Sequence, residues 1–169
     1  MYYATKYETP LGMLTLAADE RGEAITGAWF EGQKYFGGTL GQAFIEKNDF
    51  AVFDTAKSWL DRYFNGEKPS HHELPIAPCG SAFRQEVWRL LCEIPYGEVT
   101  TYGKLAAEAA RRLGKEKMSA QAIGGAVGHN PISVIIPCHR VVGTDGSMTG
   151  YAGGIELKEW LLSHEGAIK

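Results

Sequence analysis

The amino-acid sequence predicts an α+β fold, in which a small antiparallel sheet with one helix precedes a mainly helical half. Three observations support this prediction. The first thirty residues are rich in Tyr, Thr and Leu and are interrupted by turn residues, a pattern typical of short strands. Apolar residues then recur at helical spacing from Asn48 to Phe64 and in several stretches after Ala82. Between these parts lies a connection, residues 68–80, whose three prolines suit a domain boundary.

The N-terminal half is predicted to contain three strands and a helix. The strands are residues 2–8, 12–18 and 24–30. The helix is amphipathic, spans residues 48–64 and ends at Asn65-Gly66. We therefore predict an N-terminal domain of residues 1–80, including the proline-rich connection, and a C-terminal domain of residues 81–169.

The C-terminal half is predicted to be mainly helical. Its helices are residues 82–93, 102–113, 119–127 and 155–163. Thr100 and Thr101 precede the second of them, where a threonine hydroxyl can cap the helix. The second and third helices indicate a helix-turn-helix, although the basic link between them is longer than the 3–4-residue turn of the compact motif. In the last helix we expect Leu157, Trp160 and Leu161 to face the core.

Composition places the chain among ordinary globular proteins. The chain is 44% hydrophobic and 22% charged, as is usual for a globular protein. A length of 169 residues is sufficient to bury a core without disulfides. No apolar run approaches the roughly 20 residues that cross a bilayer, and the N-terminus lacks the pattern of a signal peptide. The odd number of cysteines, at Cys79, Cys92 and Cys138, argues against a disulfide framework. We expect a cytoplasmic protein without membrane contact.

The charge is unevenly distributed along the chain. The formal net charge is −3, but residues 1–81 hold 7 Lys and Arg against 11 Asp and Glu, whereas residues 82–169 hold 10 against 9. Residues 100–117 alone carry five basic and two acidic side chains. Such asymmetry permits one half to bind phosphates, although a solvated helix face would give the same pattern.

The most informative stretch is residues 135–142, where Pro137 breaks an apolar run and Cys138 and His139 follow. A cysteine in this setting is either buried packing or a positioned nucleophile, and the pattern alone leaves both interpretations open. Attack requires the thiolate, so Cys138 would need a base. Neighbouring side chains of an extended segment point to opposite faces. For His139 to be the base, either the backbone turns here or a water relays the proton.

A histidine base needs an orienting acceptor, and the sequence does not single one out. The candidates are Glu165, Glu159, Glu156 and Asp145. A Cys-His pair can also begin a zinc site, but no second pair with suitable spacing follows, so we predict no metal. Packing is the default interpretation for Cys79 and Cys92, and a solvated loop for His71 and His72.

The stretch Pro137-Cys138-His139-Arg140-Val141 resembles the acceptor motif of the O6-alkylguanine-DNA alkyltransferases, also called methylated-DNA–protein-cysteine methyltransferases. The resemblance runs from about Ala82 to Gly166, with several motifs in the same order. They are Phe83-Arg84-Gln85-Glu86-Val87-Trp88, Pro95-Tyr96-Gly97-Glu98-Val99, Asn130-Pro131, Gly150-Tyr151-Ala152-Gly153-Gly154 and Lys158-Glu159-Trp160-Leu161-Leu162-Ser163-His164-Glu165-Gly166. The first half resembles the family's variable N-terminal domain only in its sheet-then-helix layout.

This resemblance implies DNA repair by direct, irreversible transfer of an alkyl group, typically methyl, from O6 of guanine to Cys138. O4-alkylthymine is a second candidate substrate. Each molecule would act once and without a cofactor. The implied partner is double-stranded DNA containing O6-alkylguanine, bound through the minor groove by a monomer that needs no protein partner.

The resemblance also implies roles by position. His139 would act as the base through a water, Glu165 would hold His139, and Asn130 would join their hydrogen-bond network. Tyr102 would help to rotate the nucleotide and donate a proton to the departing guanine. The implied base-binding residues are Tyr151, which would stack on the base, Ala152 and Val141, whose backbone would read its edge, and Lys158, near the pocket.

DNA binding is assigned by the resemblance to the second helix of the helix-turn-helix, through Ala120, Gln121 and Gly124. Small residues let a helix approach the minor groove closely, although tight helix packing is the competing interpretation. Gln121 stands where the family commonly has an arginine that fills the space of the extruded base, so we expect weaker or differently timed extrusion. Arg112 and Lys115, near the basic link, are expected to contact phosphates.

Two other functions stay open. One is a sensor that binds alkylated DNA without repairing it, as alkyltransferase-like relatives do, and the other is a cysteine hydrolase. The retained Cys138 disfavours the first, because those relatives replace it. The adjacent His139 disfavours the second, because hydrolase histidines lie far from the cysteine in sequence. For the repair function we expect the sulfur to be ionised, in a niche open to solvent and sized for a purine.

Overall fold

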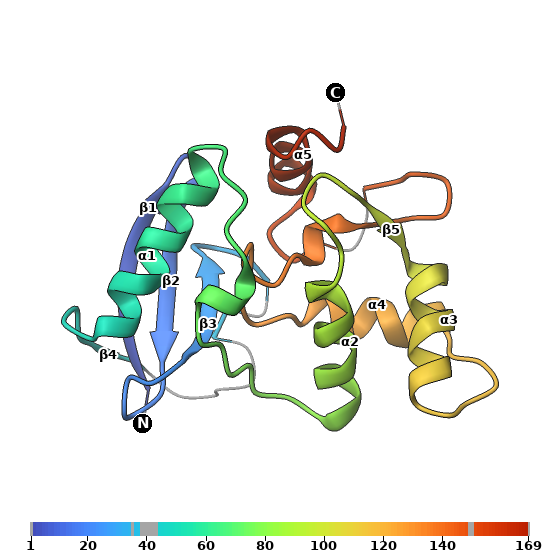
Figure 1. Cartoon of the computed structure of the whole chain (residues 1–169), viewed down its shortest axis with the longest axis horizontal. Coiled ribbons are helices and arrows are strands. Elements are labelled where there is room, and N and C mark those ends of the chain that lie inside the picture. The colour runs from blue at the N-terminus through green and yellow to red at the C-terminus, as the bar shows by residue number, and fades with distance from the viewer. Residues whose placement is uncertain (1, 35, 38–43, 149–150, 169) are drawn as a thin grey trace. The chain divides into compact units, whose positions relative to one another are not determined.

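The structure is a computed structural model that describes residues 2–34, 36–37, 44–148 and 151–168 (Figure 1). It contains two compact units. The first comprises Met1–Cys79 and Pro131–Ile135, and the second comprises Gly80–Asn130 and Ile136–Lys169.

The segment Pro131–Ile135 groups with the first unit, although the sequence placed it in the C-terminal domain. Backbone hydrogen bonds are the reason. The Ala28 N–H donates to the Pro131 carbonyl at 2.8 Å, and the Ser133 N–H donates to the Ala28 carbonyl at 2.9 Å. The segment thereby extends the edge of a sheet, a pairing between residues too distant in sequence for local patterns to indicate.

A four-stranded sheet in the order β3-β2-β1-β4 forms the centre of the first unit. The strands are β1 Tyr3–Thr9, β2 Gly12–Ala18, β3 Ile25–Phe30 and β4 Ile45–Glu46. The first three are antiparallel, as predicted, but β4 pairs parallel to β1. The sheet is therefore mixed rather than purely antiparallel. A two-residue strand is too short to leave a periodic pattern in the sequence.

One helix, α1 Ala51–Phe64, packs against this sheet (Figure 1). Its buried side chains are Val52, Phe53, Ala56, Trp59, Leu60 and Tyr63. The helix begins at Ala51 rather than at Asn48, because the Asn48 side chain accepts a hydrogen bond from the Thr5 hydroxyl at 2.6 Å and Phe50 has extended backbone. A short 3-10 helix, η2 His71–Glu73, follows in the proline-rich connection.

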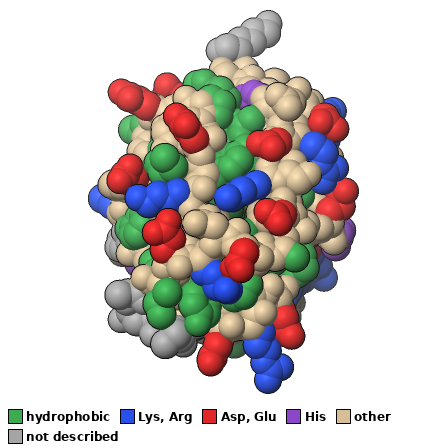
Figure 2. Space-filling model, turned by 90° about the vertical axis from the view of Figure 1, so that its left-hand side faces the viewer, with side chains coloured by type: hydrophobic (Ala, Val, Ile, Leu, Met, Phe, Trp, Pro, Cys, Tyr) green, Lys and Arg blue, Asp and Glu red, His purple; other side chains and the backbone are tan. Residues whose placement is uncertain are grey.

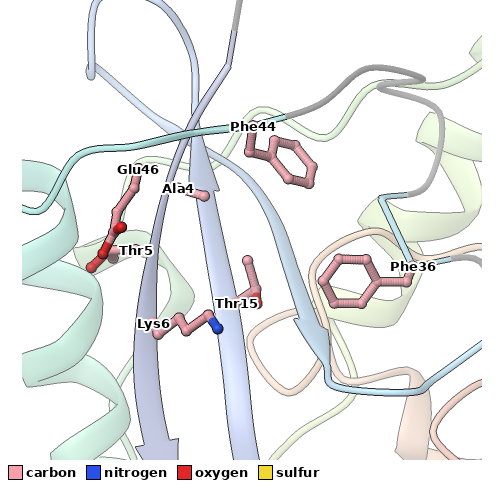
Figure 3. Close-up of a pocket in the computed structure, with 7 residues that line it drawn as sticks. All are labelled: Ala4, Thr5, Lys6, Thr15, Phe36, Phe44 and Glu46. Atoms are coloured by element: carbon pink, nitrogen blue, oxygen red, sulfur yellow. The ribbon is translucent and has the colours of Figure 1, made fainter.

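The surface of the first unit includes a cavity of about 350 Å³ over the sheet (Figure 3). Its lining residues are Ala4, Thr5, Lys6, Thr15, Phe36, Phe44 and Glu46, and none of them is a predicted site residue. On the face of the molecule in Figure 2, acidic and basic side chains are interspersed, so this face presents no broad cationic field to a polyanion. No helix in the described part of the chain is long and apolar enough to cross a bilayer.

The second unit is mainly helical. Its elements are α2 Ala82–Cys92, β5 Thr100–Thr101, α3 Tyr102–Arg112, α4 Ala120–Gly128, η3 Cys138–Arg140, β6 Val141–Val142 and α5 Ile155–His164. The helices α2, α3 and α4 pack against one another, and the Trp88 indole N–H donates to the Ala126 carbonyl at 2.9 Å. The predicted cap is confirmed, since the Thr101 hydroxyl accepts from the Lys104 N–H at 3.2 Å.

A two-stranded parallel sheet positions the start of α3. Thr100 pairs with Val141 and Thr101 pairs with Val142. Tyr102, the first residue of α3, is therefore held beside the segment that contains Cys138.

The buried face of α5 differs from the predicted one. The helix buries Lys158, Leu161 and Leu162, whereas Leu157 and Trp160 are only half-buried. The prediction is confirmed for Leu161 and wrong for Leu157 and Trp160. A lysine occupies a core-facing position here, and a hydrophobic pattern assigns lysine to the surface.

Candidate active site

The backbone turns at Cys138. The residue begins the 3-10 helix η3, and the Arg140 N–H donates to the Pro137 carbonyl at 3.0 Å. Of the two arrangements that the sequence left open for Cys138 and His139, the structure therefore has the turned backbone. The opposite-face geometry of an extended strand does not apply here.

The Cys138 thiol is buried rather than open to solvent. The residue is 6% exposed, and burial raises the pKa of the thiol above its ordinary 9.0. A hydrogen bond from Asn130 and the charge of Lys158 act in the opposite direction without overcoming burial. The expectation of an ionised sulfur in an open niche is therefore wrong for this structure. The resting thiol is neutral at pH 7, and it must lose its proton when substrate arrives.

His139 and Glu165 form a buried pair. The imidazole Nε2 lies 2.6 Å from the Glu165 Oε2, and both side chains are fully buried. Burial lowers the pKa of His139, against the opposing effect of the carboxylate, so the ring is neutral. Burial alone would raise the pKa of Glu165, but His139 and Arg140 outweigh it and hold that pKa well below 4.5. The Nε2–H consequently donates to a carboxylate, which leaves Nδ1 as the basic atom.

The structure selects Glu165 among the four carboxylates that the sequence left open. Asp145, Glu156 and Glu159 are exposed, whereas Glu165 follows α5 and turns inward. The Nδ1 atom of His139 is itself buried and has no hydrogen-bond partner among the described residues. This arrangement leaves the base available for a proton from the thiol, directly or through a water.

Arg140 is a site residue that the sequence analysis missed. Its Nε donates to the Glu165 Oε1 at 2.8 Å, its Nη2 to Oε2 at 3.1 Å, and its Nη1 to the Ile94 carbonyl at 2.7 Å. The Gly97 N–H also approaches Oε1, at 3.3 Å. The two hydrogen bonds from Arg140 to Glu165 are bidentate and hold both carboxylate oxygens in place. The available signal was an arginine directly after the Cys-His pair in a buried stretch.

Lys158 and Tyr102 lie near the sulfur. Lys158 is completely buried, and its Nζ lies 5.8 Å from the centre of the Tyr102 ring. Burial lowers the pKa of Lys158 to about 8, with the Cys138 charge acting in the opposite direction. Burial, followed by the Cys138 charge, raises the pKa of Tyr102 to about 12. A thiolate formed here would therefore have a cation and a phenol as neighbours.

Asn130 connects the end of α4 to the cysteine segment. Its side-chain amide donates to the Ile136 carbonyl at 2.8 Å and also hydrogen-bonds the Cys138 side chain. Because Ile136 precedes Cys138 by two residues, these contacts set the position of the sulfur. The structure thus connects Asn130 to the cysteine segment, whereas the resemblance implied a place in the hydrogen-bond network of His139 and Glu165.

The remaining predicted base-binding residues lie on β6 and on the loop before α5. Val141 is buried, whereas Tyr151 and Ala152 are half-buried. The Tyr151 ring lies so close to Gly153 that a Cβ there would approach it to 2.7 Å, so a larger residue at this position would require the ring to shift. Gly150, which begins the same motif, lies outside the described residues.

Comparison with known proteins assigns both halves of the chain. The DNA-binding domain of 6-O-methylguanine DNA methyltransferase matches residues 82–167, and the ribonuclease-like domain of the same protein matches residues 1–78. The chain belongs to the 6-O-methylguanine DNA methyltransferase family.

Relatives and solved structures cover nearly the whole of this methyltransferase-family chain. It is 42% identical to a methylated-DNA–protein-cysteine methyltransferase of Haemophilus influenzae, over 96% of this chain and 86% of that one. Identity to the Methanosarcina acetivorans protein of the same name is also 42%, over 99% of both. The Mycobacterium tuberculosis OGT in complex with DNA has a TM-score of 0.80 and 36% identity, over 98% of this chain and 92% of that one.

In this family member, the small residues of α4 face outward. The exposed residues are Ala120, Gln121, Ala122 and Gly125, and the buried ones are Ile123, Ala126 and Val127. A Cβ built at Gly124 or Gly125 would meet nothing within 4 Å. Tight helix packing therefore does not account for these two glycines, and the outer face of α4 is smooth and uncharged.

Arg112 is engaged by carboxylates. Two of its nitrogens lie 2.7 Å from the Glu93 carboxylate oxygens, and its Nε lies 3.0 Å from Glu108. These contacts link α3 to the end of α2 and compete with the predicted phosphate contact. Lys115 is exposed and forms no ion pair with a carboxylate within the described ranges.

Two single substitutions distinguish a structural role for Arg112 from a DNA-binding role for Lys115. Arg112→Ala is expected to lower the melting temperature, because it removes the link between α2 and α3. Lys115→Ala is expected to leave the melting temperature unchanged and to weaken DNA binding a few-fold. Thermal unfolding and fluorescence anisotropy with duplex DNA measure the two effects. A melting temperature that is unchanged in Arg112→Ala would contradict the structural role.

Two cysteines remain besides Cys138. Cys79 lies 3.8 Å from the Tyr2 hydroxyl. Burial raises the pKa of Cys92 to about 11, so Cys92 is not an activated thiol. Within the described ranges, no cluster of three or more His, Cys, Asp or Glu side chains could hold a metal ion.

Proposed function

We propose that the protein repairs DNA by transferring a methyl group from O6 of guanine to the sulfur of Cys138, once per molecule. The observation that supports this proposal most directly is a buried thiol at Cys138, followed in the same 3-10 helix by a neutral histidine whose Nε2 is held by a carboxylate. In the reaction a sulfur–carbon bond forms and the bond between O6 and the methyl carbon breaks. No cofactor is required.

Proton movements balance the transfer. The Cys138 proton passes to Nδ1 of His139, directly or through a water, and the positive charge that results is stabilised by Glu165. The guanine that leaves accepts a proton from the Tyr102 hydroxyl, and the resulting phenolate regains a proton through water as His139 releases the one that it took from Cys138. Lys158 stabilises the thiolate during this exchange, because a positive charge nearby favours the ionised sulfur.

The substrate must leave the base stack before it can reach a buried sulfur. Extrusion of a nucleotide costs a few kcal/mol. The smooth outer face of α4 suits close approach to the minor groove, with Ala120, Gln121 and Gly124 in contact. Gln121 can hydrogen-bond an orphaned cytosine but supplies no charge. Tyr151 would stack on the extruded base, and the backbone of Ala152 and Val141 would read its edge.

One copy of the chain carries every residue in this scheme, so the proposal requires neither an oligomer nor a protein partner. Its test is a titration of the protein with a duplex containing O6-methylguanine. Repaired DNA is expected to reach a plateau at one equivalent per protein. Continued product formation would indicate a turning-over hydrolase, and tight binding without repair would indicate a sensor. Either outcome would refute the proposal.

Tyr102→Phe tests the proposed proton donor. A positioned acid contributes typically 10²–10⁴-fold to a rate, so we expect single-turnover transfer at saturating DNA to slow by about 100-fold. Binding of the same duplex should change by less than about threefold, since the ring remains. Equal transfer rates for the wild type and the variant would exclude the hydroxyl from the chemistry.

A further inference from the structure

A tight turn in the loop between α2 and β5 lies against the end of α5 (Figure 1). The Glu98 N–H donates to the Pro95 carbonyl at 3.1 Å. Gly97, the third residue of this turn, has a φ of +83°. A positive φ at the third residue is typical of a type II turn and favours glycine there.

Gly97 contacts both the side chain and the main chain of Glu165. Its N–H donates to Oε1 at 3.3 Å, on the same carboxylate whose Oε2 lies 2.6 Å from the Nε2 of His139. A Cβ built at Gly97 would lie 3.2 Å from the main-chain carbonyl oxygen of Glu165. A side chain at position 97 would therefore press on the residue that holds the histidine.

Tyr96 extends the contact to the neighbours of Glu165. Its ring centre lies 5.7 Å from the guanidinium carbon of Arg140, within the range of a cation–π interaction. Its hydroxyl donates to the His164 carbonyl at 3.5 Å. Burial, followed by the Glu165 charge, raises the pKa of Tyr96, so the hydroxyl keeps its proton. The turn thus contacts the carboxylate, the arginine that binds it and the last residue of α5.

We propose that the turn of residues 95–98 positions the base of the transfer reaction, with Gly97 and Tyr96 as positioning residues that act through Glu165. The inference rests on the proposed function, because it takes His139 as the base. If the carboxylate moves, the Nε2–H of His139 loses its fixed partner, and the basic Nδ1 loses its fixed orientation. Misplacement of a reacting group by about 1 Å can cost about 100-fold in rate.

Gly97→Ala tests the proposal, with Gly66→Ala as the matched control. Gly66, directly after the C-cap of α1, also has a positive φ, of +89°, but a Cβ there would meet nothing within 4 Å. Both variants carry the backbone strain of a side chain at positive φ. Only Gly97→Ala should displace Glu165, so only this variant should change the environment of His139.

The first readout is the Nε2–H proton resonance of His139 in 15N-labelled protein, identified by its absence from His139→Gln. A short hydrogen bond to a carboxylate should place this resonance far downfield. We expect it to move upfield in Gly97→Ala and to stay in place in Gly66→Ala. A purely structural role for Gly97 would lower the melting temperature without moving this resonance.

The second readout is single-turnover methyl transfer at saturating methylated duplex. Gly97→Ala should transfer roughly 10–100-fold more slowly than the wild type, and Gly66→Ala should equal the wild type. Tyr96→Leu should move the resonance in the same direction and slow transfer by a smaller factor. Tyr96→Phe, which keeps the ring beside Arg140, should restore both values.

The two readouts separate failure of this inference from failure of the proposed function. An unmoved resonance in Gly97→Ala would overturn the role of Gly97, whether or not transfer slows, because the effect would not pass through Glu165. If Gly97→Ala does not fold, wild-type values of both readouts in Tyr96→Leu would overturn the role of the turn. A wild-type protein that shows the downfield resonance but transfers no methyl group would overturn the proposed function alone.

Discussion

Glu165→Gln is expected to reduce the rate of methyl transfer by roughly 10³–10⁴-fold, the size of loss seen when a histidine base loses its orienting carboxylate. Glutamine preserves the shape but no longer favours the Nε2–H tautomer of His139. It also leaves the partly buried Arg140 beside a neutral partner, which should lower the free energy of unfolding by about 3 kcal/mol. Single-turnover kinetics and urea unfolding measure the two effects.

The matched control is Glu159→Gln, which changes an exposed glutamate on α5, the helix that Glu165 follows. Its transfer rate and stability should equal those of the wild type. A Glu165→Gln protein that transfers at the wild-type rate would show that His139 does not depend on the carboxylate. A loss of stability without loss of rate would reduce Glu165 to a structural partner of Arg140.

The same pair makes the fold sensitive to acid. Burial lowers the pKa of His139 below its ordinary 6.5, so below about pH 6.5 the unfolded chain binds a proton that the folded protein does not. Stability therefore falls as the pH drops. Glu165, whose pKa lies below its ordinary 4.5, adds to the loss at lower pH. Urea unfolding should give a smaller free energy at about pH 5.5 than at about pH 7.5, and His139→Gln should reduce this difference. Equal pH dependence in both proteins would contradict the assignment.

The second large effect is expected for Lys158→Met, which should raise the free energy of unfolding and slow methyl transfer. Burial lowers the pKa of Lys158 from 10.5 to about 8, and one pKa unit corresponds to about 1.4 kcal/mol. Removal of the buried charge should therefore raise the free energy of unfolding at pH 7 by roughly 2–3 kcal/mol. Loss of a cation near Cys138 should slow transfer at least about tenfold.

The pH dependence of this stabilisation has a definite sign. Between pH 8 and 10.5 the unfolded chain keeps a proton on Lys158 that the folded protein has released, so the wild type gains stability as the pH rises. The advantage of the methionine variant should shrink accordingly. Lys6→Met, a substitution at an exposed position, is the control and should change neither the free energy of unfolding nor the rate of methyl transfer. Unchanged transfer in Lys158→Met would exclude Lys158 from the chemistry.

Local patterns in the sequence were sufficient for most of the fold. The strands β1 to β3, the helix α1 and a threonine cap on α3 depend on neighbouring residues, and the sequence indicated each of them. The parallel strand β4 depends on pairing between distant residues. The same holds for the grouping of Pro131–Ile135 with the first unit, so neither left a local signal.

The active site was predictable only in part, because burial is a tertiary property. The motif around Cys138 indicated a candidate nucleophile and a candidate base, but several carboxylates were equally plausible partners of His139 until folding brought Glu165 inward. Arg140 was overlooked because its role depends on contact with Glu165. The expectation of an open, ionised sulfur failed because burial outweighs the nearby charge of Lys158.

The most direct test of the central claim is peptide mapping by mass spectrometry after reaction with a duplex containing O6-methylguanine. We predict one methyl group per protein molecule, located on the peptide that contains Cys138 and absent from Cys138→Ser treated in the same way. A methyl group on Cys79 or Cys92, or a wild-type protein that stays unmodified while the duplex remains methylated, would contradict the assignment of Cys138 as the acceptor.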